Sequence, residues 1–198
     1  ATGYGVDVDP AGDVVVGACW TACANAAYVF LGSSAGIATT PVRTLTAAGA
    51  TGFGRFVYGV GELNNDALDD VVVVGGATAY VFYGAAAPST DAVSLTNLTS
   101  VAFGWDTNGD GYSDLALASR TFISASTVSV RVYYGSAGGI GVLRPFSFTS
   151  TPAGYGAAIT GLGDVDGDGY GEVAWSTQGT NVRVAPGSAS GPNAAAIT

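Results

Sequence analysis

Histidine, lysine and methionine are absent from this sequence, and all six basic residues are arginines. Without histidine or lysine, the chain can assemble neither a Ser-His-Asp triad nor a lysine nucleophile. Residues 32–36 match the G-x-S-x-G pattern of hydrolases, but the segment has no base and lies in a repeated turn. We therefore expect that the chain is not an enzyme.

Basic clusters and long apolar runs are missing as well. The formal net charge is −9, which argues against nucleic acid and anionic membranes as partners. Hydrophobic residues make up 48% of the chain, yet no run approaches the roughly 20 apolar residues of a membrane helix, so we expect no membrane insertion. A basic, apolar leader is also absent, and we expect either that it has been removed or that the chain is an excerpt from a longer one.

Cysteine is scarce, with Cys19 and Cys23 as the only two in the chain. A C-x-x-x-C pair without histidine cannot complete a four-ligand zinc site. We predict a local disulfide between these residues, which would suit an oxidising compartment. The alternative is a pair of small buried thiols.

Glycine, in contrast, is abundant, with 31 residues among short runs of valine, threonine, tyrosine and phenylalanine. This composition favours short strands joined by tight turns, and hence an all-β fold. An alternating strand that ends in a glycine turn occurs four times, and the turn glycines lie 52, 51 and 52 residues apart, at Gly32, Gly84, Gly135 and Gly187. A second apolar strand, which opens with an acid, precedes each of them.

Each repeat therefore contains about four short strands, which is the content of one propeller blade. A blade cannot bury both of its faces alone, so neighbouring blades must stack. We predict a single β-propeller region over residues 1–198, with units at roughly 1–40, 41–92, 93–144 and 145–198.

Acidic residues concentrate in four loops between these strands, and of the fifteen only Asp91 lies elsewhere. Concentrated carboxylates repel one another, and a cation relieves that repulsion. Oxygens at alternate positions, one backbone carbonyl and a closing carboxylate suit Ca²⁺ better than Mg²⁺ and offer no soft ligand for zinc. An EF-hand is excluded because a strand follows each loop at once. The alternative is an Asx-type turn capped by its own carboxylates.

The predicted calcium ligands are side-chain oxygens and, in each complete loop, one backbone carbonyl, for two to four structural ions in all. The fourth loop supplies Asp164, Asp166, Asp168, the carbonyl of Tyr170 and Glu172. The third supplies Asp106, Asn108, Asp110, the carbonyl of Tyr112 and Asp114. The second supplies Glu62, Asn64, Asp66, the carbonyl of Leu68 and Asp70, with Ala67 where the others have glycine. The first loop is two residues shorter and supplies Asp7, Asp9 and Asp13.

Two of the loops follow an aromatic-glycine pair, Phe53-Gly54 and Tyr155-Gly156. The third unit has no such pair at the matching place, because Phe103-Gly104 lies too close to Asp106. Together with the acid loops, the "VVVGA" strand and the "YVFLGS" strand, these motifs resemble the FG-GAP repeat over essentially the whole chain. The resemblance implies an integrin α-subunit-like β-propeller of the bacterial secreted or surface type, with calcium in its hairpin loops. About four blades would form a small ring, a partial ring or an excerpt of a larger propeller.

For function, we expect a non-catalytic, extracellular, calcium-binding propeller that serves as an adhesion module or as an interaction module for a protein or glycan. One alternative is a structural protein whose blades self-assemble into an oligomer or filament, which unpaired edge strands would favour. Another is an accessory part of a larger secreted hydrolase. The chain itself is a poor glycosidase, because Asp91 has no second carboxylate outside the metal loops.

Overall fold

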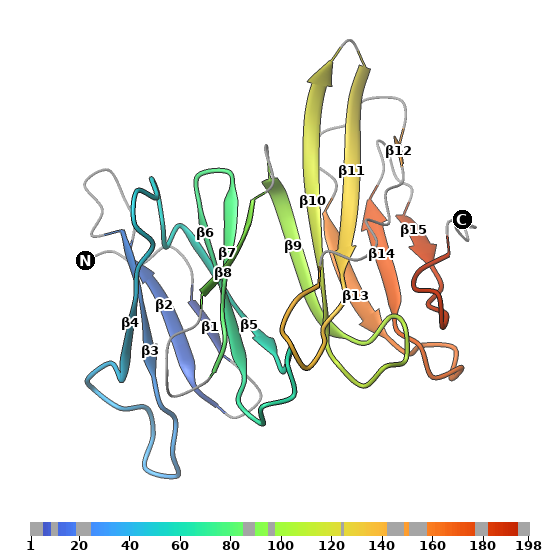
Figure 1. Cartoon of the computed structure of the whole chain (residues 1–198). Helices are drawn as coiled ribbons and strands as arrows, with labels where there is room; N and C mark the ends of the chain where they lie inside the picture. Colours follow the sequence, from blue (N-terminus) through green and yellow to red (C-terminus); the bar gives the residue numbers. More distant parts are fainter. Residues whose placement is uncertain are drawn as a thin grey trace. The chain divides into compact units, whose positions relative to one another are not determined.

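A computed structural model describes residues 6–8, 12–18, 25–84, 90–94, 98–123, 125–141, 149–150, 158–176 and 182–193. Its elements are fifteen β-strands, shown in Figure 1, and the predicted all-β class is confirmed. No helix long and apolar enough to cross a membrane occurs in these segments. The chain divides into two compact units, one of Ala1–Glu62 with Asp66–Ser94 and one of Leu63–Asn65 with Leu95–Thr198.

The first unit contains two four-stranded antiparallel sheets. One has the order β1 (Val6–Val8), β2 (Val14–Ala18), β3 (Ala26–Phe30) and β4 (Arg43–Leu45). The other has the order β5 (Phe56–Gly61), β6 (Asp70–Gly75), β7 (Thr78–Phe82) and β8 (Thr90–Ser94). Each strand pairs with the next one along the chain, which is the up-and-down order of a propeller blade.

The second unit contains a four-stranded and a three-stranded antiparallel sheet. The former consists of β9 (Leu98–Trp105), β10 (Asp114–Ile123), β11 (Ala125–Tyr133) and β12 (Thr149–Ser150). The latter consists of β13 (Ile159–Gly163), β14 (Glu172–Ser176) and β15 (Val182–Ala185). The four repeats read from the turn glycines thus correspond to four separate blade-like sheets. The β10–β11 hairpin extends well beyond the strands predicted for it (Figure 1).

The core of each unit lies between its sheets, as expected for blades that cover one another. In the first unit Phe53 is fully buried and makes edge-to-face contacts with Tyr80 and Phe82, at ring-centroid distances of 5.4 and 5.9 Å. It packs with apolar residues of both sheets, namely Val15, Ala27, Leu45, Val57 and Val73. A second cluster in the other unit joins residues of β9, β10 and β11 to Ile159 and Val173.

Phe53-Gly54, just before strand β5, is the point where the chain closely approaches the first sheet. Gly54 has a φ of +87°, and a β-carbon there would lie 2.4 Å from the carbonyl oxygen of Ala26. A β-carbon on Gly17 would lie 2.0 Å from the carbonyl oxygen of Gly54. Both positions therefore require glycine, because the two backbones touch.

Phe103-Gly104 lies within strand β9, so the prediction that it is not an aromatic-glycine pair of this kind is confirmed. Trp105 pairs with Asp114 and Phe103 with Leu115, which leaves Gly104 in a bulge with a φ of +86°. Tyr155-Gly156 lies outside the described residues.

Candidate metal centre

The three full-length acidic loops each join the first strand of a sheet to its second strand. They connect β5 to β6, β9 to β10 and β13 to β14. In each case the last acid of the loop is also the first residue of the second strand, and its side chain is buried: Asp70, Asp114 and Glu172 are 0%, 0% and 2% exposed. Strand pairing therefore fixes the closing carboxylate at the start of the second strand.

The fourth loop curls around the carboxylate of Asp164. Its Oδ1 accepts the backbone N–H groups of Gly167 (2.7 Å) and Asp168 (3.1 Å), and its Oδ2 accepts that of Gly169 (2.9 Å). Asp164, Asp166 and Glu172 each present a carboxylate oxygen within 4.8 Å of the others. Among the described residues this is the one group of three acidic side chains so closely placed. Asp168 accepts the N–H of Tyr170 (2.9 Å).

The third loop repeats this hydrogen-bond pattern at the same offsets. Asp106 Oδ1 accepts the N–H of Gly109 and its Oδ2 accepts that of Gly111, both at 2.7 Å. Asp110 Oδ1 accepts the N–H of Tyr112 (3.0 Å). The side-chain amide of Asn108 donates to Asp110 Oδ2 (2.9 Å), which leaves the Asn108 carbonyl oxygen as its oxygen donor for a metal.

The second loop has the same left-handed backbone positions as the other two, although it has no glycine there. In each loop the fourth and sixth residues have a positive φ. These pairs are Asn65 (58°) and Ala67 (66°), Gly109 (73°) and Gly111 (90°), and Gly167 (80°) and Gly169 (91°). The departure at Ala67 therefore leaves the loop conformation unchanged and costs about 1–2 kcal/mol of backbone strain.

The predicted ligands of the second loop differ in exposure. Glu62 and Asn64 are half-buried, Asp66 is exposed and Leu68 is 47% exposed. Asp66 Oδ1 accepts the N–H of Leu68 at 2.9 Å. This contact corresponds to the ones that Asp110 and Asp168 make in the other loops.

The first loop differs from the other three in where its strands pair, and its predicted ligand set stays a prediction. Asp7 lies within strand β1, opposite Val15, and not in the loop. Because this connection is two residues shorter, the β1–β2 pairing continues to Val8 opposite Val14 and takes Asp7 into the sheet. Asp9 lies outside the described residues. Asp13 remains in the connection and accepts the N–H of Gly32 (2.7 Å).

The last acid of every loop accepts a hydrogen bond from the turn glycine of its own repeat. The four N–H to carboxylate distances are 2.7 Å for Gly32 to Asp13, 2.8 Å for Gly84 to Asp70, 3.1 Å for Gly135 to Asp114 and 3.4 Å for Gly187 to Glu172. The sequence predicted a ligand role for these acids but not this contact. The sequence nevertheless contained a signal for this contact, since the closing acid and the turn glycine each occur once in every repeat. The closing carboxylate is thus held by a residue outside the loop.

The environment of Asp114 shows that burial disfavours the ionised form of a closing carboxyl group. Its Oδ2 accepts the backbone N–H (2.8 Å) and the hydroxyl group of Thr107. Burial nevertheless raises the pKa of Asp114 from 3.8 to about 6, and the negative charge of Asp106 acts in the same direction, while the hydrogen bonds from Thr107 and Gly135 oppose the shift. A cation bound in the loop would favour the ionised form. The all-oxygen donor set and this carboxyl group therefore fit a hard divalent ion.

The serine segment at residues 32–36 is a turn. Ser33 Oγ donates to the carbonyl of Gly36 (2.9 Å) and accepts the N–H of Ala35 (3.2 Å). The corresponding hydroxyl contacts recur in the third and fourth repeats, from Ser136 and Ser188. Cys19 and Cys23, in the connection between β2 and β3, lie outside the described residues.

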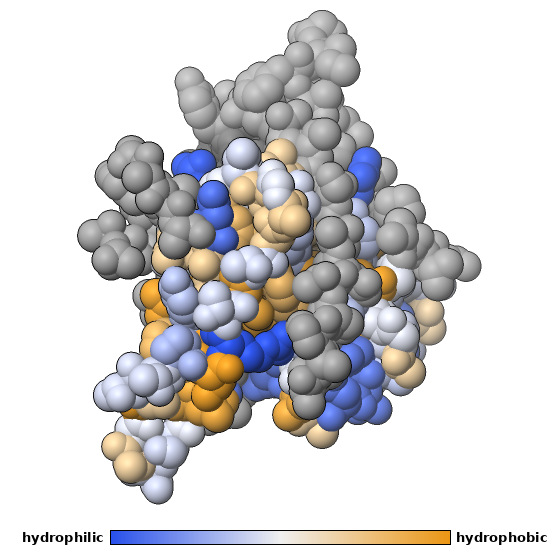
Figure 2. Space-filling model, turned by 60° about the vertical axis from the view of Figure 1, so that its left-hand side comes forward, coloured by the Kyte–Doolittle hydropathy of each residue, from blue (hydrophilic) through white to orange (hydrophobic). Residues whose placement is uncertain are grey.

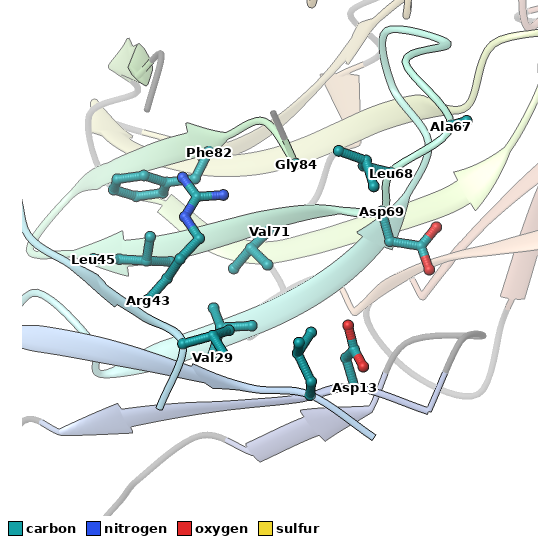
Figure 3. Close-up of a pocket in the computed structure, with 12 residues that line it drawn as sticks. Asp13, Val29, Arg43, Leu45, Ala67, Leu68, Asp69, Val71, Phe82 and Gly84 are labelled. Atoms are coloured by element: carbon teal, nitrogen blue, oxygen red, sulfur yellow. The ribbon is translucent and has the colours of Figure 1, made fainter. Parts of the chain in front are cut away.

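A groove of about 260 Å³ lies between the two sheets of the first unit (Figure 3). Leu31, Val42 and Leu68 line it and are 47%, 51% and 47% exposed. The Arg43 guanidinium lies beside the Phe82 ring and donates to the carbonyl of Tyr83 (2.9 Å). On the side of the molecule in Figure 2, hydrophobic surface lies next to hydrophilic surface. Exposed apolar side chains that gather around a groove are typical of a contact surface.

Comparison with known proteins identifies one family. Residues 97–140 match the FG-GAP repeat, over a segment that contains β9, the third acidic loop, β10 and β11. No curated protein matches the chain. The resemblance predicted from the motifs is thereby confirmed for this repeat, which is a building block of propeller-type interaction modules.

Proposed function

Since residues 97–140 form an FG-GAP repeat, we propose that this chain is a non-catalytic, calcium-stabilised propeller segment that binds a protein or glycan outside the cell. The observation that carries the proposal is the shared geometry of the acidic loops. The third and fourth loops make the same backbone-to-carboxylate hydrogen bonds, and the fourth gathers three carboxylates within 4.8 Å.

Calcium would be held in the fourth loop by Asp164, Asp166, Asp168, Glu172 and the carbonyl of Tyr170. In the third loop the corresponding residues are Asp106, Asn108, Asp110, Asp114 and the carbonyl of Tyr112, and in the second Glu62, Asn64, Asp66, Asp70 and the carbonyl of Leu68. The ion would neutralise carboxylates that otherwise repel one another at the start of a strand. Its role would be structural, because these residues also hold the hairpin between two strands of the sheet.

Two features support binding over catalysis. The chain has no histidine and no lysine, and all but one of its acids lie in the loops. The exposed apolar groove beside Leu31, Val42 and Leu68 offers a surface for a partner. An extracellular location is consistent with the calcium sites, since weak extracellular modules are filled at roughly millimolar calcium.

Self-association is a second candidate function. Among the described residues β15 is the last strand of the sheet of β13, β14 and β15, and it could pair with a strand from another copy. Size-exclusion chromatography with and without chelator tests this alternative. Elution near the mass of one chain in both conditions would exclude it.

Thermal unfolding with calcium and with EGTA tests the calcium proposal. Calcium at 100 times its Kd should stabilise the fold by about 2.7 kcal/mol per site, and calorimetric titration should give two to three sites. The double variant Asp164→Asn/Asp166→Asn should lose one site, whereas Asp91→Asn, outside the loops, should retain all of them. Identical melting curves with calcium and EGTA, together with no heat of binding, would refute the proposal.

A further inference from the structure

The third and fourth loops are in direct contact within the second unit. The backbone N–H of Gly171, the eighth residue of the fourth loop, donates to the carbonyl of Asp106, the first residue of the third, at 2.6 Å. The N–H of Ser188, in the turn of the fourth repeat, donates to the carbonyl of Thr107 at 3.1 Å. The backbone that carries the central carboxylate of the third loop is therefore anchored to the fourth repeat.

Tyr170 connects the two loops through its side chain. A β-carbon on Gly109 would lie 2.6 Å from Cε1 and 3.0 Å from Cδ1 of the Tyr170 ring, so the ring covers this residue of the third loop. The N–H of Gly109 donates to Asp106 Oδ1, so the covered residue holds one of the predicted ligands of the third loop. Tyr170 thus belongs to the fourth loop through its backbone and contacts the third through its ring.

Hydrogen bonds also link the closing carboxylates of the two loops. Glu172 accepts the N–H of Gly187, and the next residue, Ser188, donates to Thr107. Thr107 is fully buried and donates in turn to Asp114 through its N–H and hydroxyl groups. A shift of Glu172 in response to a bound ion would therefore be transmitted to Asp114 through the Gly187–Ser188 backbone and Thr107. Thr107 is fully buried, so it cannot absorb the shift by moving into solvent.

We propose that the third and fourth loops bind calcium cooperatively, with Tyr170 as the positioning residue that couples them. The proposal rests on the proposed function, because it concerns the same calcium sites. An ion in the fourth loop fixes the Asp164–Glu172 segment and hence the Tyr170 ring and the Gly171 N–H. The third loop then has less conformational freedom left to lose when it binds its own ion.

The sign of the coupling depends on two opposed effects. Binding one Ca²⁺ removes two negative charges from the pair of loops, which weakens the attraction for the second ion. Salt at physiological ionic strength screens the part of that effect that acts between the exposed carboxylates of the two loops. Ordering through contacts such as Gly171 to Asp106 is not screened, so the net coupling is positive, with an affinity change on the order of five-fold or more.

Two glycine amides report the loops separately in one NMR titration of the full chain with calcium. The N–H of Gly111 donates to Asp106 in the third loop, and that of Gly169 donates to Asp164 in the fourth. In the wild-type protein the two resonances should respond together over one steep transition. In Asp164→Asn/Asp166→Asn the Gly111 transition should move to a calcium concentration about five-fold higher or more.

Substitutions of Tyr170 test its assignment without removing a ligand, since its backbone carbonyl remains. Tyr170→Ala should shift the Gly111 and Gly169 midpoints to higher calcium and make both transitions less steep, because the coupling between two binding sites is reciprocal. Tyr170→Phe keeps the ring and should behave like the wild type. If the loop-four double variant does not fold, the comparison of wild type, Tyr170→Ala and Tyr170→Phe is sufficient by itself.

The outcomes separate the inference from the proposed function. Calcium-dependent shifts at both glycines, with a Gly111 midpoint that is the same in every variant, would overturn the coupling and leave the calcium sites in place. Transitions in Tyr170→Ala that stay as steep as those of the wild type would overturn the role of Tyr170. No calcium-dependent shift at either glycine in the wild type would refute the proposed calcium sites and the coupling with them.

Discussion

Stability of the metal-free protein should decrease as the pH rises, because of the buried carboxyl group of Asp114. Burial raises the pKa of Asp114 from 3.8 to about 6, so the folded state binds this proton more tightly than the unfolded chain does. The stabilisation from that proton is fully present below the unfolded-state pKa of 3.8 and is lost as the pH rises through the folded-state pKa of about 6.

The two pKa values of Asp114 set the size of the effect. Between pH 4.5 and 7.5 they lower the free energy of unfolding by about 2 kcal/mol. In a chain of this size that loss corresponds to a decrease of about 4–8 °C in Tm. Calcium should reverse the trend, because a bound cation favours the ionised carboxylate.

Urea unfolding of protein stripped on a chelating resin, over the same pH range, measures this effect. The Asp114→Asn variant carries no titrating group at this position and should lose about 2 kcal/mol of the wild-type pH dependence. Asp110→Asn, at an exposed position of the same loop, is the matched control and should keep that part. A slope in Asp114→Asn equal to that of the wild type, or a wild-type stability that rises with pH, would refute the reasoning.

Two further predictions concern the backbone. Ala67→Gly should relieve the left-handed strain at this position and stabilise the calcium-bound second loop by about 0.5–1 kcal/mol, measured as a higher Tm in calcium; a lower Tm would contradict it. Gly17→Ala would place a β-carbon 2.0 Å from the carbonyl oxygen of Gly54 and should destabilise the fold by about 3 kcal/mol or more in urea unfolding. Gly138→Ala, where the nearest atom would be 3.9 Å away, should change stability by less than about 0.5 kcal/mol, and equal effects of the two alanines would argue against the close contact.

The second loop shows a limit of prediction from the local residue pattern. Alanine at position 67 departs from the glycine found in the other loops, yet its φ of 66° matches theirs. Strands β5 and β6 pair on both sides of the loop, with Gly61 opposite Asp70, and so fix its two ends. Eight residues between fixed ends have few ways to bring alternate oxygens together. The fold therefore imposes the same backbone conformation on alanine as on the glycines of the other loops.

The first loop shows the opposite case. There the sequence contains acids at alternate positions, and the pattern predicts a site that includes Asp7. The connection is shorter than in the other loops, and the backbone of Asp7 pairs with that of Val15, while the ligand role of Asp7 stays a prediction. A residue pattern indicates which atoms are present, but the length of chain between paired strands decides where the backbone that carries them lies.

The sequence by itself determined the all-β class, the four repeats and the oxygen-rich loops, because strand alternation, turn glycines and ligand spacing all act within a few residues of the chain. Only the tertiary structure decided which groups hold those loops. Three kinds of contact join residues between 14 and 61 positions apart. They are the hydrogen bond from each turn glycine to a closing acid, the backbone contact of Gly54 with Gly17, and the packing of the Tyr170 ring over Gly109. Contacts of that range depend on how strands pair and sheets pack, which no local spacing encodes.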